Sequence, residues 1–279
     1  MAVRSPEGTE VLDIDARCEE LRDLVRPCGE FEQSTCMATA NSIRLLPDGT
    51  PLLNQLLGAL PAAAYAGLQG SLRMNIGVTG RVLHQHGVPI SDIYFPNGGV
   101  FSVTNEMRDG TLVEVATVGC EGLLGIGVFL GDRSGWGRTF QQVPGGPFPS
   151  MPAGRFIRES NRAGPFREMC RRYAQANLQQ IMQCAACNAL HTVKQRCCRW
   201  LLQTEDRVGS HEFQLKQEFL AIMLGVHRPT VTVVMRGLQD AGLIASKYGR
   251  IRVLKRKRLE LISCECYGVI RTLFEQPNA

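Results

Sequence analysis

The pattern of apolar positions changes along the chain and predicts three kinds of structure. Leucines recur at helical spacing between Leu52 and Leu60, and Pro61 is the expected first-turn residue of a second short helix. From Gly77 to Gly146 the chain carries 15 of its 29 glycines, spaced between short β-prone runs. After a loop at 143–154 the spacing becomes helical again. This order predicts short helices, then a sheet domain, then a mostly helical part.

The glycine-rich window predicts an antiparallel sandwich or barrel. Thr111–Val118 alternates apolar and polar positions, and Arg108-Asp109-Gly110 before it has the composition of a hairpin turn. Ile93-Tyr94-Phe95 and Val100–Val103 flank a second turn cluster, Pro96–Gly99. Many short strands at this spacing are typical of a sandwich or barrel, and not of alternating strands and helices.

A long helix is predicted from Gly164-Pro165 to about Leu190, followed by another over about 190–203. The long helix carries an apolar ridge formed by Ala174, Leu178, Ile181, Ala185 and Ala189. Because the ridge outlasts the thickness of one domain, we expect it to pack on a partner helix. The spacing leaves open whether that helix belongs to the same chain or to a second subunit.

Gln217–Arg236 has the offsets of a helix-turn-helix. Ala221 provides a small residue where two helices cross, Gly225 opens the turn with a positive φ, and Pro229 lies in the first turn of the second helix. The apolar residues expected to hold the two helices together are Leu220, Leu224, Val226, Val231 and Val234. Gly242 ends the second helix, and Ile244–Leu254 then predicts a two-stranded wing that turns at Tyr248-Gly249.

The charge distribution indicates a polyanionic partner for this part of the chain. The chain has 279 residues, enough for two modest domains, and a net charge of +5. Residues 206–279 hold 12 Lys or Arg against 7 Asp or Glu, whereas residues 1–40 hold 4 against 9. Within 247–258, seven of twelve residues are basic and none is acidic. Joined to a helix-turn-helix, this segment favours binding of double-stranded DNA.

In such a complex the second helix lies in the major groove with its N-terminal residues at the base edges. The candidates for base contacts are His227, Arg228, Thr230, Thr232 and Val233. Arg228 is the best candidate for guanine, because its planar fork reaches O6 and N7 together, and Val233 meets a thymine methyl or nothing. The candidates for phosphate contacts are Lys216, Arg236, Lys247 and Arg250, and Gln217 completes the set of DNA-binding candidates. Lys255–Arg258 is either a further contact or a solvated basic run.

The sequence resembles the Crp–Fnr superfamily of bacterial transcription regulators over about residues 41–279. The resemblance rests on Ile93-Tyr94-Phe95-Pro96, Val118–Gly122 and Leu224–Ile244, and on the order of the parts. It implies an α+β fold: an N-terminal double-stranded β-helix (jelly-roll) sensor-like domain, a long dimerisation helix and a C-terminal winged helix-turn-helix. It also implies a DNA-binding regulator that is not an enzyme and that binds a pseudo-palindromic promoter site as a homodimer, with RNA polymerase as a candidate partner.

The expected organisation therefore has four parts. Residues 1–40 form an acidic tail, 41–154 a cyclic-nucleotide-binding-like β-roll, 155–190 a linker and dimerisation helix, and 191–279 the winged helix-turn-helix domain. The start of the chain lacks the apolar stretch of a secretion signal, and there is no run of eighteen apolar residues. We therefore expect a cytoplasmic protein with no membrane partner.

The nucleotide-binding signature of that family is missing. Its cyclic-nucleotide sites use a short helix beginning Gly-Glu to hold the ribose, and then an Arg-Ser pair for the cyclic phosphate. Here Ile126 follows Gly125 where the carboxylate should be, Arg133-Ser134 comes too early, and Trp136 is near the position of the phosphate arginine. Burying a phosphate without a cation is costly, so we predict no response to cyclic AMP. The β-roll is then a sensor of something else or a dimer scaffold.

The 11 cysteines leave a second hypothesis open, namely a thiol- or metal-based redox sensor. Cys18, Cys28 and Cys36 with central Cys120 are spaced too loosely for the iron–sulfur loop of this superfamily, so no cluster is expected. Cys184 and Cys187, with Cys197-Cys198 further on, permit a zinc site, but apolar packing is favoured. Cys264 and Cys266 are likewise expected to be buried thiols.

The remaining patterns predict no cofactor, metal or catalytic site. His84 and His86 alternate along an expected strand and so point the same way, but no third ligand is evident. The chain has no G-x-S-x-G elbow, P-loop or H-E-x-x-H motif. An enzymatic function is therefore not expected.

Overall fold

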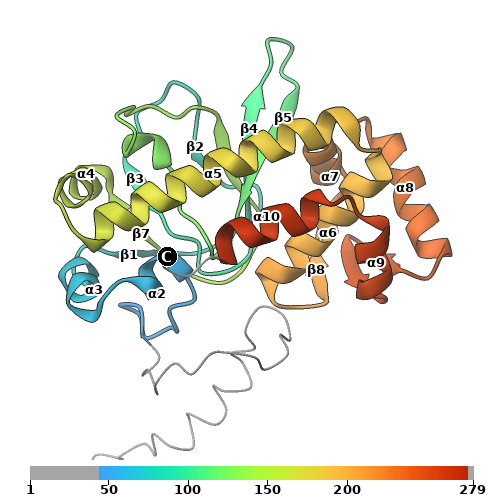
Figure 1. Cartoon of the computed structure of the whole chain (residues 1–279). Helices are drawn as coiled ribbons and strands as arrows, with labels where there is room; N and C mark the ends of the chain where they lie inside the picture. Colours follow the sequence, from blue (N-terminus) through green and yellow to red (C-terminus); the bar gives the residue numbers. More distant parts are fainter. Residues whose placement is uncertain (1–43, 276–279) are drawn as a thin grey trace, which may run out of the picture. The chain divides into compact units, whose positions relative to one another are not determined.

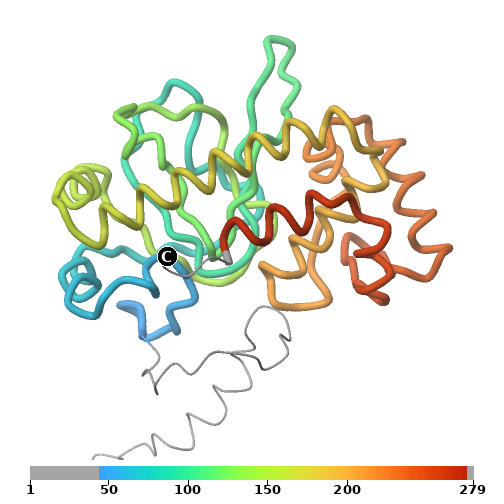
Figure 2. The backbone as a smooth tube through the Cα atoms, in the orientation of Figure 1, coloured from blue at the N-terminus to red at the C-terminus, as the bar shows by residue number. Residues whose placement is uncertain are grey.

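The computed structural model describes residues 44–275, which all lie within one compact unit of the chain, residues 38–279. The predicted acidic tail lies outside the described residues. Two short helices, α2 (Gln55–Ala59) and α3 (Ala62–Gln69), precede the sheets (Figures 1 and 2). The side chain of Asn54 caps α2 by accepting a hydrogen bond from the amide of Leu57, whereas Pro61 lies just before the first turn of α3 instead of within it.

The glycine-punctuated region folds into two antiparallel sheets, as the spacing predicted. One sheet has the order β1 (Arg73–Asn75), β7 (Phe148–Pro152), β3 (Asp92–Tyr94). The other has the order β2 (Val82–His84), β6 (Arg138–Val143), β4 (Val100–Glu106), β5 (Leu112–Val118). β4 and β5 form the predicted hairpin, in which Gly110 has a φ of +82°. The η1 turn (Ile126–Val128) lies between β5 and β6.

The alternation along β5 predicted the buried side chains of that strand only partly correctly. Glu114 and Thr117 belong to the polar positions of that strand, but both are buried. The sheet face that they share is covered by the helices that follow, so it is not a solvated face as an isolated strand would suggest. β5 therefore contributes buried polar groups to a helix–sheet interface.

The long predicted helix is confirmed: α5 spans Pro165–Leu190 and runs across the sheets (Figure 1). It follows α4 (Ala153–Asn161) and is followed by α6 (Val193–Val208), which begins with a capping box between Thr192 and Gln195. One face of α5 is buried through residues such as Phe166, Cys170 and Tyr173. The predicted apolar ridge lies on the other face, and Leu178 on it is 59% exposed.

The last part of the described chain is a winged helix-turn-helix. Its elements are β8 (Glu212–Gln214), α7 (Gln217–Leu224), α8 (Arg228–Asp240), β9 (Ile244–Lys247), β10 (Arg250–Val253), α9 (Arg256–Ile262) and α10 (Cys266–Glu275). The predicted two-stranded wing has a third strand, because β8 pairs with β10. The core of this part is continuous with Val100 and Val143 of the four-stranded sheet. The α+β fold class predicted from sequence is confirmed.

Candidate nucleic-acid interface

Local sequence explains how α7 and α8 are held at an angle. The two helices bend by 105° at the break between them, where Gly225 adopts a φ of +59°. Leu220, Leu224 and Val231 are almost completely buried between the helices and the core. Because α8 uses one face for this packing, its opposite face and its first turn lie at the surface.

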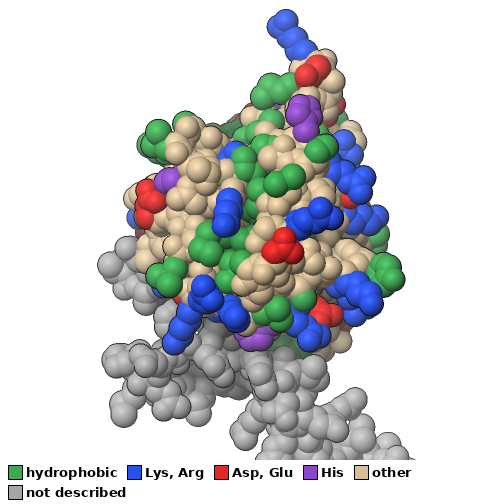
Figure 3. All heavy atoms as spheres, turned by 90° about the vertical axis from the view of Figure 1, so that its right-hand side faces the viewer, with side chains coloured by type: hydrophobic (Ala, Val, Ile, Leu, Met, Phe, Trp, Pro, Cys, Tyr) green, Lys and Arg blue, Asp and Glu red, His purple; other side chains and the backbone are tan. Residues whose placement is uncertain are grey.

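The candidate residues on α8 are all exposed. They are His227, Arg228, Thr230, Thr232, Val233 and Arg236. Val233 is 72% exposed, so its side chain is accessible to a partner molecule. Figure 3 looks onto the side of the molecule where α7 and α8 lie, and Lys and Arg side chains recur across it. The structure therefore brings the predicted groove-facing residues together on one accessible helix face.

Two side chains of α7 orient residues of α8. Glu218 forms an ion pair with Arg228 at 3.1 Å, and Gln217 accepts a hydrogen bond of 2.9 Å from the hydroxyl of Thr232. Lys216 is exposed immediately before α7. The carboxylate of Glu218 therefore orients the guanidinium group of Arg228. A contact between Arg228 and a base has to compete with this ion pair.

The wing presents further cations at the surface. Tyr248 and Gly249 turn the β9–β10 hairpin with φ of 52° and 74°, as predicted. Lys247 is exposed beside the Tyr248 ring, and Arg250 pairs with Glu212 at 3.4 Å. Arg252 was not among the predicted site residues, although it lies two positions along the same strand and pairs with the same carboxylate. The period-two alternation of β10 could have identified it.

The basic run at 255–258 has a mixed role. Arg256 forms ion pairs with Glu205 and Asp206 at 2.7 Å each, and so joins α9 to α6. The other three members, Lys255, Lys257 and Arg258, are at least partly exposed. One of the four basic residues therefore serves the fold, and three remain at the surface.

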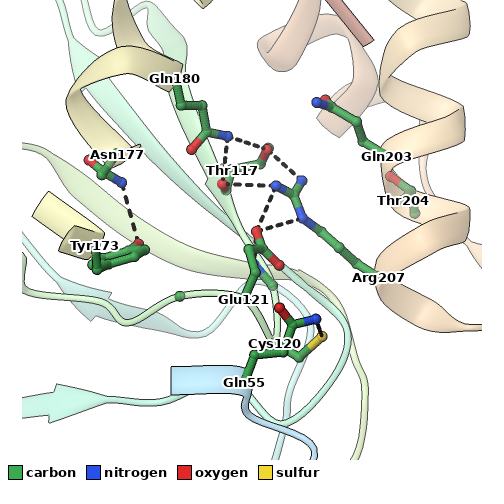
Figure 4. Close-up of polar contacts among 12 residues, drawn as sticks. Gln55, Thr117, Cys120, Glu121, Tyr173, Asn177, Gln180, Gln203, Thr204 and Arg207 are labelled. Carbon is green, nitrogen blue, oxygen red and sulfur yellow. Dashed lines mark hydrogen bonds and ion pairs between the residues drawn. The ribbon is translucent and has the colours of Figure 1, made fainter. Parts of the chain in front are cut away.

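A buried polar network joins the sheet, α5 and α6 (Figure 4). Arg207 of α6 binds Glu121 at 2.8 Å and donates a hydrogen bond of 2.6 Å to the hydroxyl of Thr117. Gln180 of α5 donates to the carbonyl oxygen of Thr117 at 3.0 Å. Glu121 also accepts from the amide of Gly119 at 3.0 Å. The network therefore fixes two consecutive helices, α5 and α6, to a sheet segment that lies 60 or more positions earlier in the chain.

Glu114 is a second buried carboxyl group in this region. It accepts a hydrogen bond of 2.5 Å from the hydroxyl of Ser102. Burial raises the pKa of Glu114 to about 7, and the Ser102 hydrogen bond and the charges of Arg199 and Arg207 oppose that shift. The group consequently changes its protonation near neutral pH.

Two positions that would contact a cyclic nucleotide in the resembled family hold Ile126 and Trp136 here. Ile126 begins the η1 turn after Gly125, whose φ is +96°. The indole of Trp136 lies against Gly127 and donates a hydrogen bond of 2.5 Å to Asp132. Neither Ile126 nor Trp136 carries a positive charge that could bind the phosphate of a cyclic nucleotide.

The expectation that His84 and His86 lie on one strand and point the same way is wrong. His84 is buried and its Nε2 lies 2.9 Å from the carbonyl oxygen of Asp92, whereas exposed His86 lies beyond the end of β2. Burial lowers the pKa of His84, which favours the neutral imidazole. The two rings are therefore in different environments.

The cysteines near the end of α5 and on α6 are buried, as the favoured interpretation of apolar packing predicted. Cys197 and Cys198 are buried in the core of the winged domain, and Cys184 is buried on α5. Cys264 and Cys266 are buried as predicted, but they lie with Cys187 and His191 in a combination that no local spacing indicated. The three N-terminal cysteines lie outside the described residues.

Among residues 44–275, no single helix has both the length and the apolar character needed to cross a membrane. The bent pair α7 and α8 passes that test of length and composition only when both are taken together.

Comparison with known proteins identifies a similar helix-turn-helix domain and a similar fold. Residues 195–262 match the Crp-like helix-turn-helix domain. No curated protein matches the chain. A Crp/Fnr-family transcriptional regulator from Eubacterium rectale ATCC 33656 is 18% identical with a TM-score of 0.59, and the alignment covers 75% of this chain and 97% of that one.

Two further solved structures show the same fold. FixK2 from Bradyrhizobium japonicum is 12% identical, with a TM-score of 0.59 and coverage of 69% of this chain and 98% of its own. A CRP-family transcriptional regulator from Thermus thermophilus, TTHB099, is 17% identical, with a TM-score of 0.57 and coverage of 68% and 96%. The order of sheet domain, long helix and winged domain is thus shared at low sequence identity.

Proposed function

We propose that this chain, a DNA-binding transcription regulator of the Crp/Fnr family, recognises a specific pseudo-palindromic site as a homodimer through α8 and the wing. The observation that carries the proposal is the exposure of the first turn of α8 while its other face is buried against α7. A helix presented in this way can enter the major groove of B-DNA. The fold family is that of non-enzymatic regulators.

The residues of α8 would divide into base and phosphate contacts. Arg228 at the start of the helix would read a guanine, with His227, Thr230, Thr232 and Val233 meeting neighbouring base edges. Exposed Lys216, Arg236, Lys247 and Arg250 would contact phosphates, and Gln217 would hold Thr232 in place. Arg252 joins the phosphate set because it lies two positions from Arg250 on the same face of β10 and pairs with the same carboxylate.

The dimer would form along α5. Leu178, Met182 and Leu190 are 59%, 64% and 80% exposed on this 26-residue helix. Apolar side chains along a long helix whose other face is already packed favour a second parallel helix as partner. A Leu178→Glu variant should be monomeric by sedimentation and should lose affinity for a palindromic site. A variant that remains dimeric would exclude this surface.

The DNA-binding proposal is tested by selecting bound fragments from genomic DNA and then measuring affinity for the selected site. Arg228→Ala should weaken that site by about 1–3 kcal/mol and relax the preference at one base pair. Arg133→Ala removes a surface arginine from the β-roll and serves as the matched control. Equal, weak binding of the unaltered protein to every fragment would contradict the proposal.

We further propose that DNA binding is independent of cyclic AMP. Ile126 and Trp136 support this proposal, because they provide neither the carboxylate nor the cation that a cyclic phosphate and ribose require. Addition of saturating cyclic AMP should leave the affinity for the selected site unchanged. A tenfold increase would contradict it.

A further inference from the structure

Four metal-ligating side chains meet where the end of α5 approaches the start of α10. Cys187 and His191 come from the last turn and C-cap of α5, Cys264 lies between α9 and α10, and Cys266 is the first residue of α10. One ligand atom of each lies within 4.8 Å of all the others. The three cysteines are buried, and the His191 side chain is 16% exposed.

The individual distances have the scale of a ligand set. The Sγ atoms of Cys187 and Cys264 are 3.5 Å apart, and Sγ of Cys266 is 3.6 Å from Nδ1 of His191. With Zn–S bonds of about 2.3 Å and Zn–N bonds of about 2.0 Å, a tetrahedral ion places its ligand atoms about 3.5–3.8 Å apart. A disulfide would need sulfurs about 2.05 Å apart.

We propose that Cys187, His191, Cys264 and Cys266 form a closed Cys₃His site for Zn²⁺. Three sulfurs and one imidazole nitrogen are a common ligand set of structural zinc, and they leave no open position for catalysis. Each thiol that binds the ion loses its proton to solvent, and His191 binds as neutral imidazole through Nδ1. Two of the ligands, Cys187 and Cys264, are 77 positions apart in the sequence.

Neighbouring side chains support these four ligands. Nε2 of His191 lies 3.1 Å from a carboxylate oxygen of Glu265, which leaves Nδ1 free of its proton and directed at the sulfurs. Gln183 donates a hydrogen bond of 3.0 Å to Sγ of Cys266. Three thiolates and one Zn²⁺ leave one negative charge, and buried Arg199 interacts electrostatically with both Cys187 and Cys264.

The proposed zinc site lies where a bound metal would connect two helices. α5 is the helix proposed to pair with a second subunit, and α6 follows it after Thr192. A metal bound here would fasten α10 to the end of α5, next to the point where the chain enters the DNA-binding domain. This zinc site goes beyond the proposed function and does not depend on it.

The test measures metal in the full chain without DNA. Protein purified under reductant and incubated with Zn²⁺, then desalted, should retain about one zinc ion per chain by elemental analysis. Replacement by Co²⁺ should give the thiolate charge-transfer bands and the visible bands of a tetrahedral site. Cys264→Ser should lose the metal, whereas Cys184→Ser should keep it, because Cys184 is buried one turn away on the same helix but outside the four-ligand set.

A second pair of variants separates ligand loss from misfolding. His191→Ala should lose most of the metal, and His191→Cys should regain it with a stronger charge-transfer band from a fourth thiolate. Unaltered protein with native circular dichroism that retains neither zinc nor cobalt would overturn the proposal. Retention of iron in place of zinc, or equal metal loss in Cys184→Ser and Cys264→Ser, would also overturn it.

Discussion

Two arginine–glutamate pairs of similar geometry have opposite environments in this protein. Arg228 and Glu218 are 3.1 Å apart with side chains 64% and 55% exposed, whereas Arg207 and Glu121 are 2.8 Å apart with side chains 8% and 10% exposed. Water screens the first pair, so Arg228 can exchange its carboxylate for another anion at little cost. The second pair is desolvated, and its partners are fixed by additional hydrogen bonds from Gly119 and to Thr117. The comparison separates a cation available for recognition from one that holds elements together.

The largest effect is expected from Arg207→Met. The substitution leaves Glu121 buried without its cation, so the free energy of unfolding should fall by about 3–5 kcal/mol. Chemical denaturation followed by circular dichroism measures this change. The matched variant Arg228→Met should alter stability by less than about 1 kcal/mol. Equal losses in the two variants would remove the distinction between the pairs.

The double variant Arg207→Met/Glu121→Leu sharpens the same comparison. Since it removes both charges, it should recover a large part of the stability lost in Arg207→Met. A double variant less stable than Arg207→Met would mean that the hydrogen bonds of Glu121 matter more than its charge.

Glu114→Gln should change how stability depends on pH. The folded protein holds the proton of Glu114 up to a pKa of about 7, above its ordinary value of 4.5. Glu114 therefore lowers the free energy of unfolding as pH rises from about 4.5 to about 7, by an amount on the order of 3 kcal/mol. The glutamine variant lacks this decline, so its stability relative to the unaltered protein should rise between pH 5 and pH 8. If the free energies of unfolding of the two proteins changed in parallel across that range, the prediction of a raised pKa for Glu114 would be contradicted.

Lys247→Ala should weaken DNA binding without changing sequence preference. An exposed cation of the wing that contacts one phosphate contributes to all sequences alike. The slope of log affinity against log salt should therefore become shallower by about 1, as measured by fluorescence anisotropy on selected and random duplexes. A loss confined to the selected site would assign Lys247 to base recognition.

The smallest effect is expected for the coupling between Arg228 and Glu218. A double-mutant cycle with Arg228→Ala and Glu218→Ala should give a coupling energy for folding below about 1 kcal/mol. Glu218→Gln alone should strengthen DNA binding slightly, because it removes a competing carboxylate from Arg228. Weaker binding in Glu218→Gln would instead show that Glu218 orients the arginine for recognition.

Sequence reasoning identified the features whose causes are local. The positive φ of Gly225, the packing of Leu220 and Val231, and the start of α5 at Pro165 all follow from offsets within a few residues. The candidate residues on α8 share one exposed helix face for the same reason, and their roles stay predictions. Arg252 was missed although strand alternation pointed to it, and the alternation misplaced Glu114 because helices cover that strand.

The sequence by itself determined the order of the elements, the helix-turn-helix and the exposed face of its second helix, because helical and strand periods decide which neighbouring residues share a surface. Only the tertiary structure decided the partners of Arg207, 86 positions from Glu121, and the grouping of Cys187 and His191 with Cys264 and Cys266. Such contacts depend on where the chain returns after a helix or a sheet has been packed, and no local spacing encodes that distance.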